Sequence, residues 1–237
     1  MCRLALMNRE GIKLAENNYR GGIEVLFDCL ENSFGGHGNG YATFYDNKKI
    51  KVKKNVILTN NEIATDILKN LDNIEYVIYH TRLASVGNVN NVNCHPFKIG
   101  YNVLAMNGTE SWAKPFIAKN ETDTETILKI ATEIDKNLIE VCSKLGSVFV
   151  GAYAGKVFAT HGRGDLELLQ SGKGLIFASE FPTAWYKGNI KIYDAPKTWI
   201  EGEKIDIKRL REIKIKATAS KVSYVPIRYQ YQYLFIE

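Results

Sequence analysis

The order in which strand-like and helical patterns follow one another constrains the fold of this chain more than any other feature. Strand patterns dominate its beginning and its end, and the longest helical pattern lies between them. This order is typical of an α+β fold in which antiparallel sheets are stacked and helices form the outer layers. Helices are expected over residues 21–34, 60–71 and 122–145, and strands over residues 4–7, 41–45, 50–52, 74–79, 101–105, 148–154, 157–160, 166–169, 175–178 and, as a terminal pair, 224–236. Asn60 is expected to cap the second helix, and Thr122 the third, where Glu125 completes capping-box spacing.

The length and composition fit one soluble domain. A chain of 237 residues with 45% hydrophobic content predicts a single domain over residues 1–237. No stretch reaches the roughly 18 uninterrupted apolar residues of a membrane span. Charged residues interrupt the first twenty positions, so no signal peptide is predicted and a cytoplasmic location is expected. The net charge of +5 comes from scattered lysines, which favours a solvated surface over a nucleic-acid interface.

The cysteines and glycines do not form a metal or phosphate motif. Cys2, Cys29, Cys94 and Cys142 are widely spaced and include no CxxC pair, so neither a zinc site nor a disulfide framework is predicted, and no cofactor is expected. The glycine-rich segment 35–40 precedes a strand rather than a helix. We therefore interpret it as a turn and not as a phosphate-binding loop.

Cys2 is the candidate nucleophile. Removal of Met1 would give it both a thiol and a free α-amino group, whose ordinary pKa values are about 8.5 and about 7.7 to 8.0. The amine could then accept the thiol proton, so this nucleophile would need no histidine. The strand predicted to start at once would hold the residue inside the fold.

Six segments within roughly the first 130 residues form one ordered set of motifs. They are Met1-Cys2-Arg3-Leu4, His37-Gly38-Asn39-Gly40-Tyr41-Ala42, His80-Thr81-Arg82-Leu83-Ala84-Ser85-Val86-Gly87, Asn93-Cys94-His95-Pro96-Phe97, Asn107-Gly108 and Thr122-Asp123-Thr124-Glu125. In content and order these segments resemble the class II glutamine amidotransferases, the N-terminal-cysteine branch of the N-terminal nucleophile (Ntn) hydrolases, and the first is similar to the start of the stand-alone members. The resemblance implies a four-layer αββα sandwich and glutaminase chemistry, in which ammonia is released from glutamine or a γ-glutamyl amide through a thioester.

The resemblance also implies a role for each site residue. Cys2 would attack the amide, and the Asn107 side chain and Gly108 N–H would stabilise the oxyanion. Arg82 would bind the substrate α-carboxylate and Asp123 the α-ammonium. The substrate site would also include Ser85 and Val86. His80 and His95 are interpreted as structural, because the amine of Cys2 would serve as the base.

Two departures from the family and two alternatives accompany this interpretation. Arg3 replaces the common glycine after the cysteine, and Met106 replaces the histidine before Asn107-Gly108. The chain could instead be an Ntn hydrolase of another amide, or a catalytically silent binding or assembly subunit. An ammonia acceptor, if there is one, would lie on a separate synthase subunit.

Overall fold

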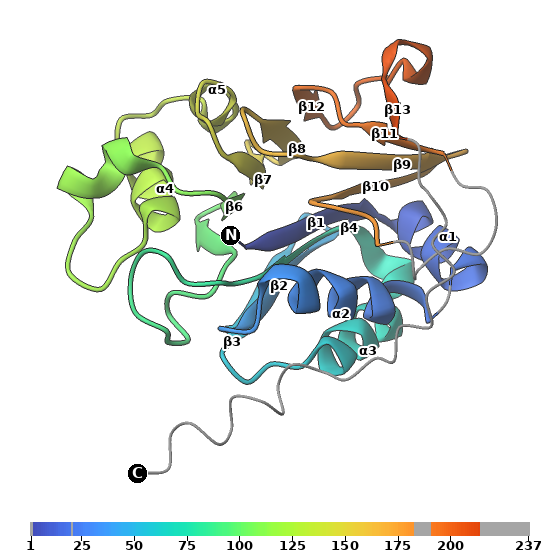
Figure 1. Cartoon of the computed structure of the whole chain (residues 1–237), viewed down its shortest axis with the longest axis horizontal. Coiled ribbons are helices and arrows are strands. Elements are labelled where there is room, and N and C mark those ends of the chain that lie inside the picture. The colour runs from blue at the N-terminus through green and yellow to red at the C-terminus, as the bar shows by residue number, and fades with distance from the viewer. Residues whose placement is uncertain (1, 20, 183–190, 214–237) are drawn as a thin grey trace.

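The computed structural model describes residues 2–19, 21–182 and 191–213, and it contains two antiparallel β-sheets stacked on each other (Figure 1). The larger sheet has the strand order β13-β11-β9-β10-β1-β4-β2-β3, and the smaller sheet has the order β12-β8-β7-β6-β5. Strands of the larger sheet are β1 (Arg3–Asn8), β2 (Asn39–Tyr45), β3 (Ile50–Asn55), β4 (Ile74–Thr81), β9 (Glu167–Ser171), β10 (Gly174–Ala178), β11 (Ile192–Asp194) and β13 (Glu212–Ile213). Strands of the smaller sheet are β5 (Phe97–Ile99), β6 (Asn102–Asn107), β7 (Val148–Tyr153), β8 (Lys156–His161) and β12 (Thr198–Ile200).

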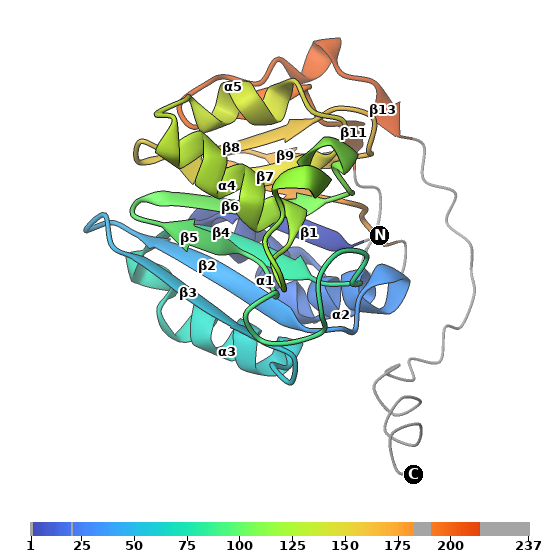
Figure 2. The same cartoon turned by 90° about the vertical axis from the view of Figure 1, so that its left-hand side faces the viewer.

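Helices cover the outer face of each sheet (Figure 2). The larger sheet packs against α1 (Arg9–Asn18), α2 (Gly22–Phe34) and α3 (Asn60–Lys69). The smaller sheet packs against α4 (Asp123–Glu133) and α5 (Leu138–Ser143). Short 3-10 helices occur at Leu71–Asn73, Ser111–Phe116 and Ile207–Arg209.

Three layers of apolar side chains hold the sandwich together. Strand β1 is apolar on both faces because each face packs into a different layer. Ala5 and Met7 face the core beneath α1, α2 and α3. Leu4 and Leu6 face the core between the two sheets. A third core lies between the smaller sheet and α4 and α5. These layers confirm the predicted α+β, αββα architecture.

The cap of α3 differs from the sequence prediction. Thr59, not Asn60, is the N-cap: its side chain accepts a bond from the Glu62 N–H at 3.2 Å, and the Glu62 carboxylate accepts one from the Thr59 N–H at 2.8 Å. Asn60 is the first helical residue and is buried, where its amide donates to Asp28 and Glu31. The polar side chain therefore serves a buried hydrogen-bond cluster instead of the helix end.

The predicted helix 122–145 is wrong as one element. Thr122 caps α4 as expected, accepting a bond from the Glu125 N–H at 3.2 Å. The helix ends before Ile134, and Asp135 then takes a left-handed conformation with φ of 51°. Asn137 starts α5 by accepting bonds from the N–H groups of Ile139 and Glu140.

The remaining elements divide into confirmed, missed and untested ones. The helix over 21–34 and the hairpin formed by β2 and β3 are confirmed. Helix α1 was not predicted, because Asn8 caps it directly after β1 without an intervening turn signal. The terminal strand pair at 224–236 lies outside the described residues. Among the described helices, none has both the length and the apolar character needed to cross a bilayer.

The strand registers bring the sequence motifs to one end of the sandwich. Arg3 of β1 and Asn39 of β2 both lie opposite Thr81, the last residue of β4. In the smaller sheet, β6 ends at Asn107 and packs against β1 across the inter-sheet core. Cys2 directly precedes β1, Arg82 directly follows β4, and Asn107 is the last residue of β6, so all three lie at this edge.

Candidate active site

Cys2 lies at the buried start of β1, beside the segment that leaves β4. Its thiol is 3.5 Å from the Leu83 carbonyl oxygen, to which it donates, and it accepts a bond from the Leu83 N–H at 3.4 Å. Burial raises the pKa of the thiol, an effect that the Leu83 hydrogen bond and the positive charge of Arg82 oppose. The thiol is thus held in place as a neutral group, and a base must remove its proton before it can attack.

The segment after β4 is locked to the turn before β2. The Arg82 N–H donates to the Gly38 carbonyl at 2.9 Å, and the His37 N–H donates to the Arg82 carbonyl at the same distance. His37 also accepts a bond through Nδ1 from the Ala84 N–H at 3.0 Å. Two motifs more than forty residues apart therefore form one rigid wall beside Cys2.

Arg82 is almost fully buried, and its guanidinium organises the loop that follows. It donates to the backbone carbonyls of Asn88 and Val86, both at 2.7 Å, and to that of Gly87 at 3.2 Å. Of its five N–H donors, two have no partner among the described residues. In the same loop, the Ser85 hydroxyl lies 3.1 Å from the hydroxyl of Thr109.

Asn107 and Gly108 occupy the end of β6. The Asn107 amide nitrogen donates to the Ser179 hydroxyl at 3.4 Å, and the same hydroxyl accepts a bond from the Leu4 N–H at 3.0 Å. The buried Oδ1 of Asn107 has no partner among the described residues. Gly108 has a φ of +143°, and a Cβ there would lie 2.2 Å from the Ser147 hydroxyl, so only glycine fits.

Asp123 is a buried carboxylate at the first position of α4. Its Oδ2 accepts a bond from the Glu110 N–H and its Oδ1 one from the Thr124 N–H, each at 3.0 Å. Burial raises its pKa, although these backbone bonds act in the opposite direction. No described Lys or Arg forms an ion pair with it. The two backbone bonds therefore fix the orientation of the carboxylate.

Most of the predicted site residues line one small pocket, whose cavity of about 10 Å³ has room for roughly one water molecule. Asn107 is not among the lining residues, although Gly108, the next residue, is. The predicted site residues that line the pocket are Cys2, Arg82, Ser85, Val86, Gly108 and Asp123. A thiol, a cation and an anion thus converge on one narrow space.

His80 and His95 form a neutral pair beside Cys2, and His95 itself lines the pocket. Their rings stack with centroids 4.2 Å apart, and His80 Nε2 lies 3.0 Å from the Met106 carbonyl. Burial lowers the pKa of His80 to about 3 and that of His95 well below its ordinary value. Within the described part of the chain, no hydrogen bond joins Cys2 to a histidine.

Ser179 and Ser147 are residues of this site that the sequence analysis did not identify. Ser179 follows β10 directly and connects β1 to Asn107, and Ser147 packs against Gly108. No motif marked either serine. Only the position of Ser179 at the end of an apolar strand distinguished it, and many surface serines share that position.

Comparisons with known proteins identify one family and a related fold. The family described as glutamine amidotransferases class-II matches residues 4–176. The glutamine phosphoribosylpyrophosphate (PRPP) amidotransferase from B. subtilis, complexed with ADP and GMP, superposes with a TM-score of 0.53 at 14% identity, over 85% of this chain and 49% of that one. This chain thus spans about half the length of that enzyme.

Two further solved structures are more distant in shape. A glutamine aminotransferase class-II domain protein from Silicibacter pomeroyi has a TM-score of 0.45 at 11% identity, over 84% of this chain and 98% of that one. A predicted glutamine amidotransferase from Pseudomonas aeruginosa PA01 has a TM-score of 0.36 at 15% identity, over 84% and 89%. A search of curated proteins gives no match.

Proposed function

Because this chain belongs to the class II glutamine amidotransferases, we propose that it releases ammonia from glutamine or a γ-glutamyl amide, with Cys2 as an N-terminal nucleophile. The observation that carries the proposal is the convergence of Cys2, Arg82 and Asp123 on one pocket. A free amino acid presents a carboxylate and an ammonium, which match a cation and an anion placed beside a thiol. The family supports the class of chemistry, and the pocket supports the roles of these residues.

The reaction would proceed through a thioester. With Met1 removed, the α-amine of Cys2 accepts the thiol proton, and the sulfur attacks the side-chain amide carbon. The Asn107 amide and the Gly108 N–H stabilise the resulting oxyanion. The amine passes the proton to the departing nitrogen, so ammonia leaves and the thioester remains. Water then attacks the thioester, which regenerates the thiol and releases glutamate.

Substrate entry would require the loop over residues 84–93 to move. The cavity holds roughly one water molecule, so it is too small for glutamine as it stands. The carbonyls of Val86 and Asn88 hold the loop on Arg82, which keeps two donors for a substrate carboxylate. We propose that the loop opens to admit glutamine while Arg82 remains the anchor for both.

An experiment on the purified full chain tests the proposal. Its intact mass should show the loss of Met1, and ammonia should appear when glutamine is added. Cys2→Ala should abolish ammonia release, and a protein that keeps one extra residue before Cys2 should fold normally but lose most activity. Cys142→Ala, a change in the core under α5, is the control and should keep its activity.

Covalent labelling separates this proposal from its competitors. A diazoketone analogue of glutamine should add its mass to the peptide that begins with Cys2 and to no peptide containing Cys29, Cys94 or Cys142. Labelling at Cys94, beside His95, would instead indicate a conventional Cys-His enzyme. A folded, processed protein that neither reacts nor releases ammonia from any γ-glutamyl amide would be the silent subunit.

The destination of the ammonia forms a separate part of the proposal. We expect the described chemistry to end at free ammonia unless a synthase subunit binds nearby, in the cytoplasm, to consume it. A glutaminase rate that rises only when a co-purified partner and its acceptor substrate are added would identify such a complex. An unchanged rate would indicate simple hydrolysis.

A further inference from the structure

A second cavity lies between the two sheets at the end of the sandwich opposite Cys2. Arg3 pairs with Thr81 at the Cys2 end, whereas Asn8 pairs with Tyr76, five residues back along β4. At a rise of roughly 3.3 Å per residue, Tyr76 is about 17 Å from Thr81. The cavity has a volume of about 340 Å³, which is within the range of small-molecule sites.

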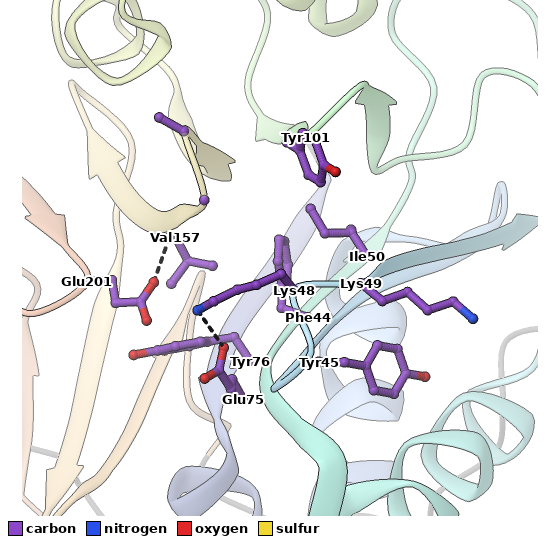
Figure 3. Close-up of a pocket in the computed structure, with 12 residues that line it drawn as sticks. Phe44, Tyr45, Lys48, Lys49, Ile50, Glu75, Tyr76, Tyr101, Val157 and Glu201 are labelled. Atoms are coloured by element: carbon purple, nitrogen blue, oxygen red, sulfur yellow. Dashed lines mark hydrogen bonds and ion pairs between the residues drawn. The ribbon is translucent and has the colours of Figure 1, made fainter.

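Aromatic and aliphatic side chains from both sheets form the walls of this cavity (Figure 3). Phe44 and Tyr76 come from the larger sheet, Val157 comes from the smaller sheet, and Tyr101 precedes β6. Tyr101 is 70% exposed at the mouth, so it offers ring surface that no described residue covers. Such walls suit a flat apolar body, which the rings can contact face to face or edge to face.

The charged groups that face the cavity are unbalanced. Figure 3 shows Lys48 reaching over the ring of Tyr76, with Glu75 and Glu201 around the same space; Lys49 also lines the cavity, but its ammonium end points away from these carboxylates. One ammonium therefore faces two carboxylates. Tyr76 lies among them: burial raises the pKa of its hydroxyl to about 12, and the charges of Glu201 and Glu75 add to this effect.

Lys48 holds its place only weakly. Its ammonium is 3.9 Å from the Glu75 carboxylate, and its side chain is 76% exposed. Ion pairs of this kind contribute little because solvent screens them. Glu201 is more firmly placed, since its carboxylate accepts a bond from the Val157 N–H at 3.2 Å. Another cation that also buried an apolar body could replace the Lys48 ammonium between the carboxylates.

We propose that this cavity binds a small aromatic amine, with its ring between the two sheets and its ammonium between Glu75 and Glu201 in place of Lys48. The rings of Tyr76 and Tyr101 would add cation–π and stacking contacts. The hydroxyl of Tyr76 has no hydrogen-bond partner among the described residues and is available to the ligand. The site is separate from the Cys2 pocket, and the proposal does not depend on glutaminase activity.

Binding of matched probes to the intact protein tests the charge and the apolar body separately. 2-Phenylethylamine should bind in calorimetry or saturation-transfer NMR. The uncharged 2-phenylethanol and the anionic 3-phenylpropionate should bind at least about tenfold more weakly, the scale of one charge-assisted contact. Equal binding of the amine and the alcohol would overturn the charge assignment. No binding of the amine at millimolar concentration to folded protein would overturn the site.

Variants test the location of the site, because two of them should change the affinity for the amine in opposite directions. The double change Glu75→Gln and Glu201→Gln should weaken amine binding about tenfold or more, while the new amide oxygen at position 201 could still accept the Val157 N–H bond. Lys48→Met should tighten binding, because it removes the competing ammonium from an exposed side chain. Glu140→Gln, a change at an exposed position of α5, is the matched control and should leave affinity unchanged. Weaker binding to the Lys48→Met protein would contradict the proposal even if the double variant were unstable.

Discussion

Arg82 holds the loop that follows β4 and is also the proposed ligand of the substrate carboxylate. The sequence suggests a pocket residue, and the structure adds that its guanidinium donates to the backbone carbonyls of Val86, Gly87 and Asn88. A buried cation with three carbonyl partners fixes the loop by charge-assisted hydrogen bonds. Removal of Arg82 should therefore affect the loop as well as substrate affinity.

Arg82→Ala should lower kcat/KM for glutamine. The loss should correspond to about 2 to 4 kcal/mol of transition-state free energy, which is the scale of a lost buried charge contact. The substitution should also expose residues 84–93 to limited proteolysis, because three carbonyls lose their donor. Arg209→Ala, which removes an exposed arginine paired with Asp206, is the control. Parent-like kinetics in the Arg82→Ala protein would show that the pocket assignment is wrong.

Ser179 gives a second prediction at this scale, because its hydroxyl connects β1, which follows Cys2, to Asn107, the proposed oxyanion donor. Ser179→Ala leaves the buried Leu4 N–H without its acceptor, at a cost of about 1 to 3 kcal/mol in the free energy of unfolding. It also releases the Asn107 amide, so kcat should fall about tenfold or more while KM changes little.

A control variant tests whether the loss of kcat in Ser179→Ala comes from the position of Asn107 or from lower stability. Thr160→Val removes a buried hydroxyl on β8 that donates to the Lys197 carbonyl at 2.8 Å. Its stability loss should be similar, but kcat should stay at the parent value. If both variants lost kcat in proportion to stability, Ser179 would have only a structural role.

At the scale of elements, the sequence predicted those that local patterns determine and failed where tertiary contacts decide. The apolar spacing of Ile130, Ile134 and Leu138 continued through the break between α4 and α5, so periodicity alone could not reveal it. The break depends on the left-handed backbone at Asp135 and on the cap by Asn137. The cap by Thr59 was missed for a related reason, since the neighbouring asparagine was an equally good local candidate.

Two glycines of the glycine-rich segment, Gly38 and Gly40, lie where another segment packs too closely for a side chain. A Cβ on Gly40 would lie 2.1 Å from the His95 carbonyl oxygen and 2.7 Å from the Lys54 Cβ. A Cβ on Gly38 would lie 2.5 Å from the Cys94 sulfur. The glycine-rich turn and the segment before β5 therefore pack at backbone distance, which the sequence could show only as two separate motifs.

Gly40→Ala should destabilise the protein by about 2 to 3 kcal/mol, because the new methyl group overlaps a backbone oxygen. Gly146→Ala is the matched control: the nearest atom to its Cβ would be Glu110 Oε1 at an ordinary 3.8 Å. Chemical denaturation should show a change below about 1 kcal/mol for the control. Equal stability of the two variants would refute the close packing inferred at Gly40.

For the whole molecule, the stacking of the two sheets determines which distant residues meet. Cys2, the proposed nucleophile, precedes a strand of the larger sheet, and Asn107 ends a strand of the smaller sheet, so neither sheet carries the candidate site alone. Sequence patterns predict the strands but not their order, and the order brings β6 over β1. The imidazole pair of His80 and His95 joins the same two sheets through the Met106 backbone.

That junction makes stability depend on pH. Since the folded protein keeps His80 neutral down to a pKa of about 3, the unfolded chain, with an ordinary value near 6.5, binds more protons between these limits. Stability contributed by His80 is therefore complete above about pH 6.5 and falls by up to about 1.4 kcal/mol per pH unit as the pH drops toward 3. His95 shifts in the same direction.

Glu167 acts in the opposite sense. Burial raises the pKa of its carboxyl to about 7, and its Oε2 accepts a bond from the Phe181 N–H at 2.6 Å. The folded protein thus binds the extra proton between the ordinary value near 4.3 and about 7. Stability contributed by this group is complete at low pH and is lost as the pH rises through that window, so it offsets part of the histidine effect.

Unfolding free energies measured by denaturant titration between pH 5 and pH 7 should resolve these two contributions. Glu167→Gln should steepen the loss of stability on acidification by up to one proton per molecule, because it removes the opposing carboxyl while its amide oxygen can still accept the Phe181 N–H. His80→Gln, which can still donate to the Met106 carbonyl, should be less stable at pH 7 but show a slope shallower by up to one proton. A loss of packing alone would shift the curve without changing its slope, so parallel curves for the parent and both variants would refute the assignment of these groups.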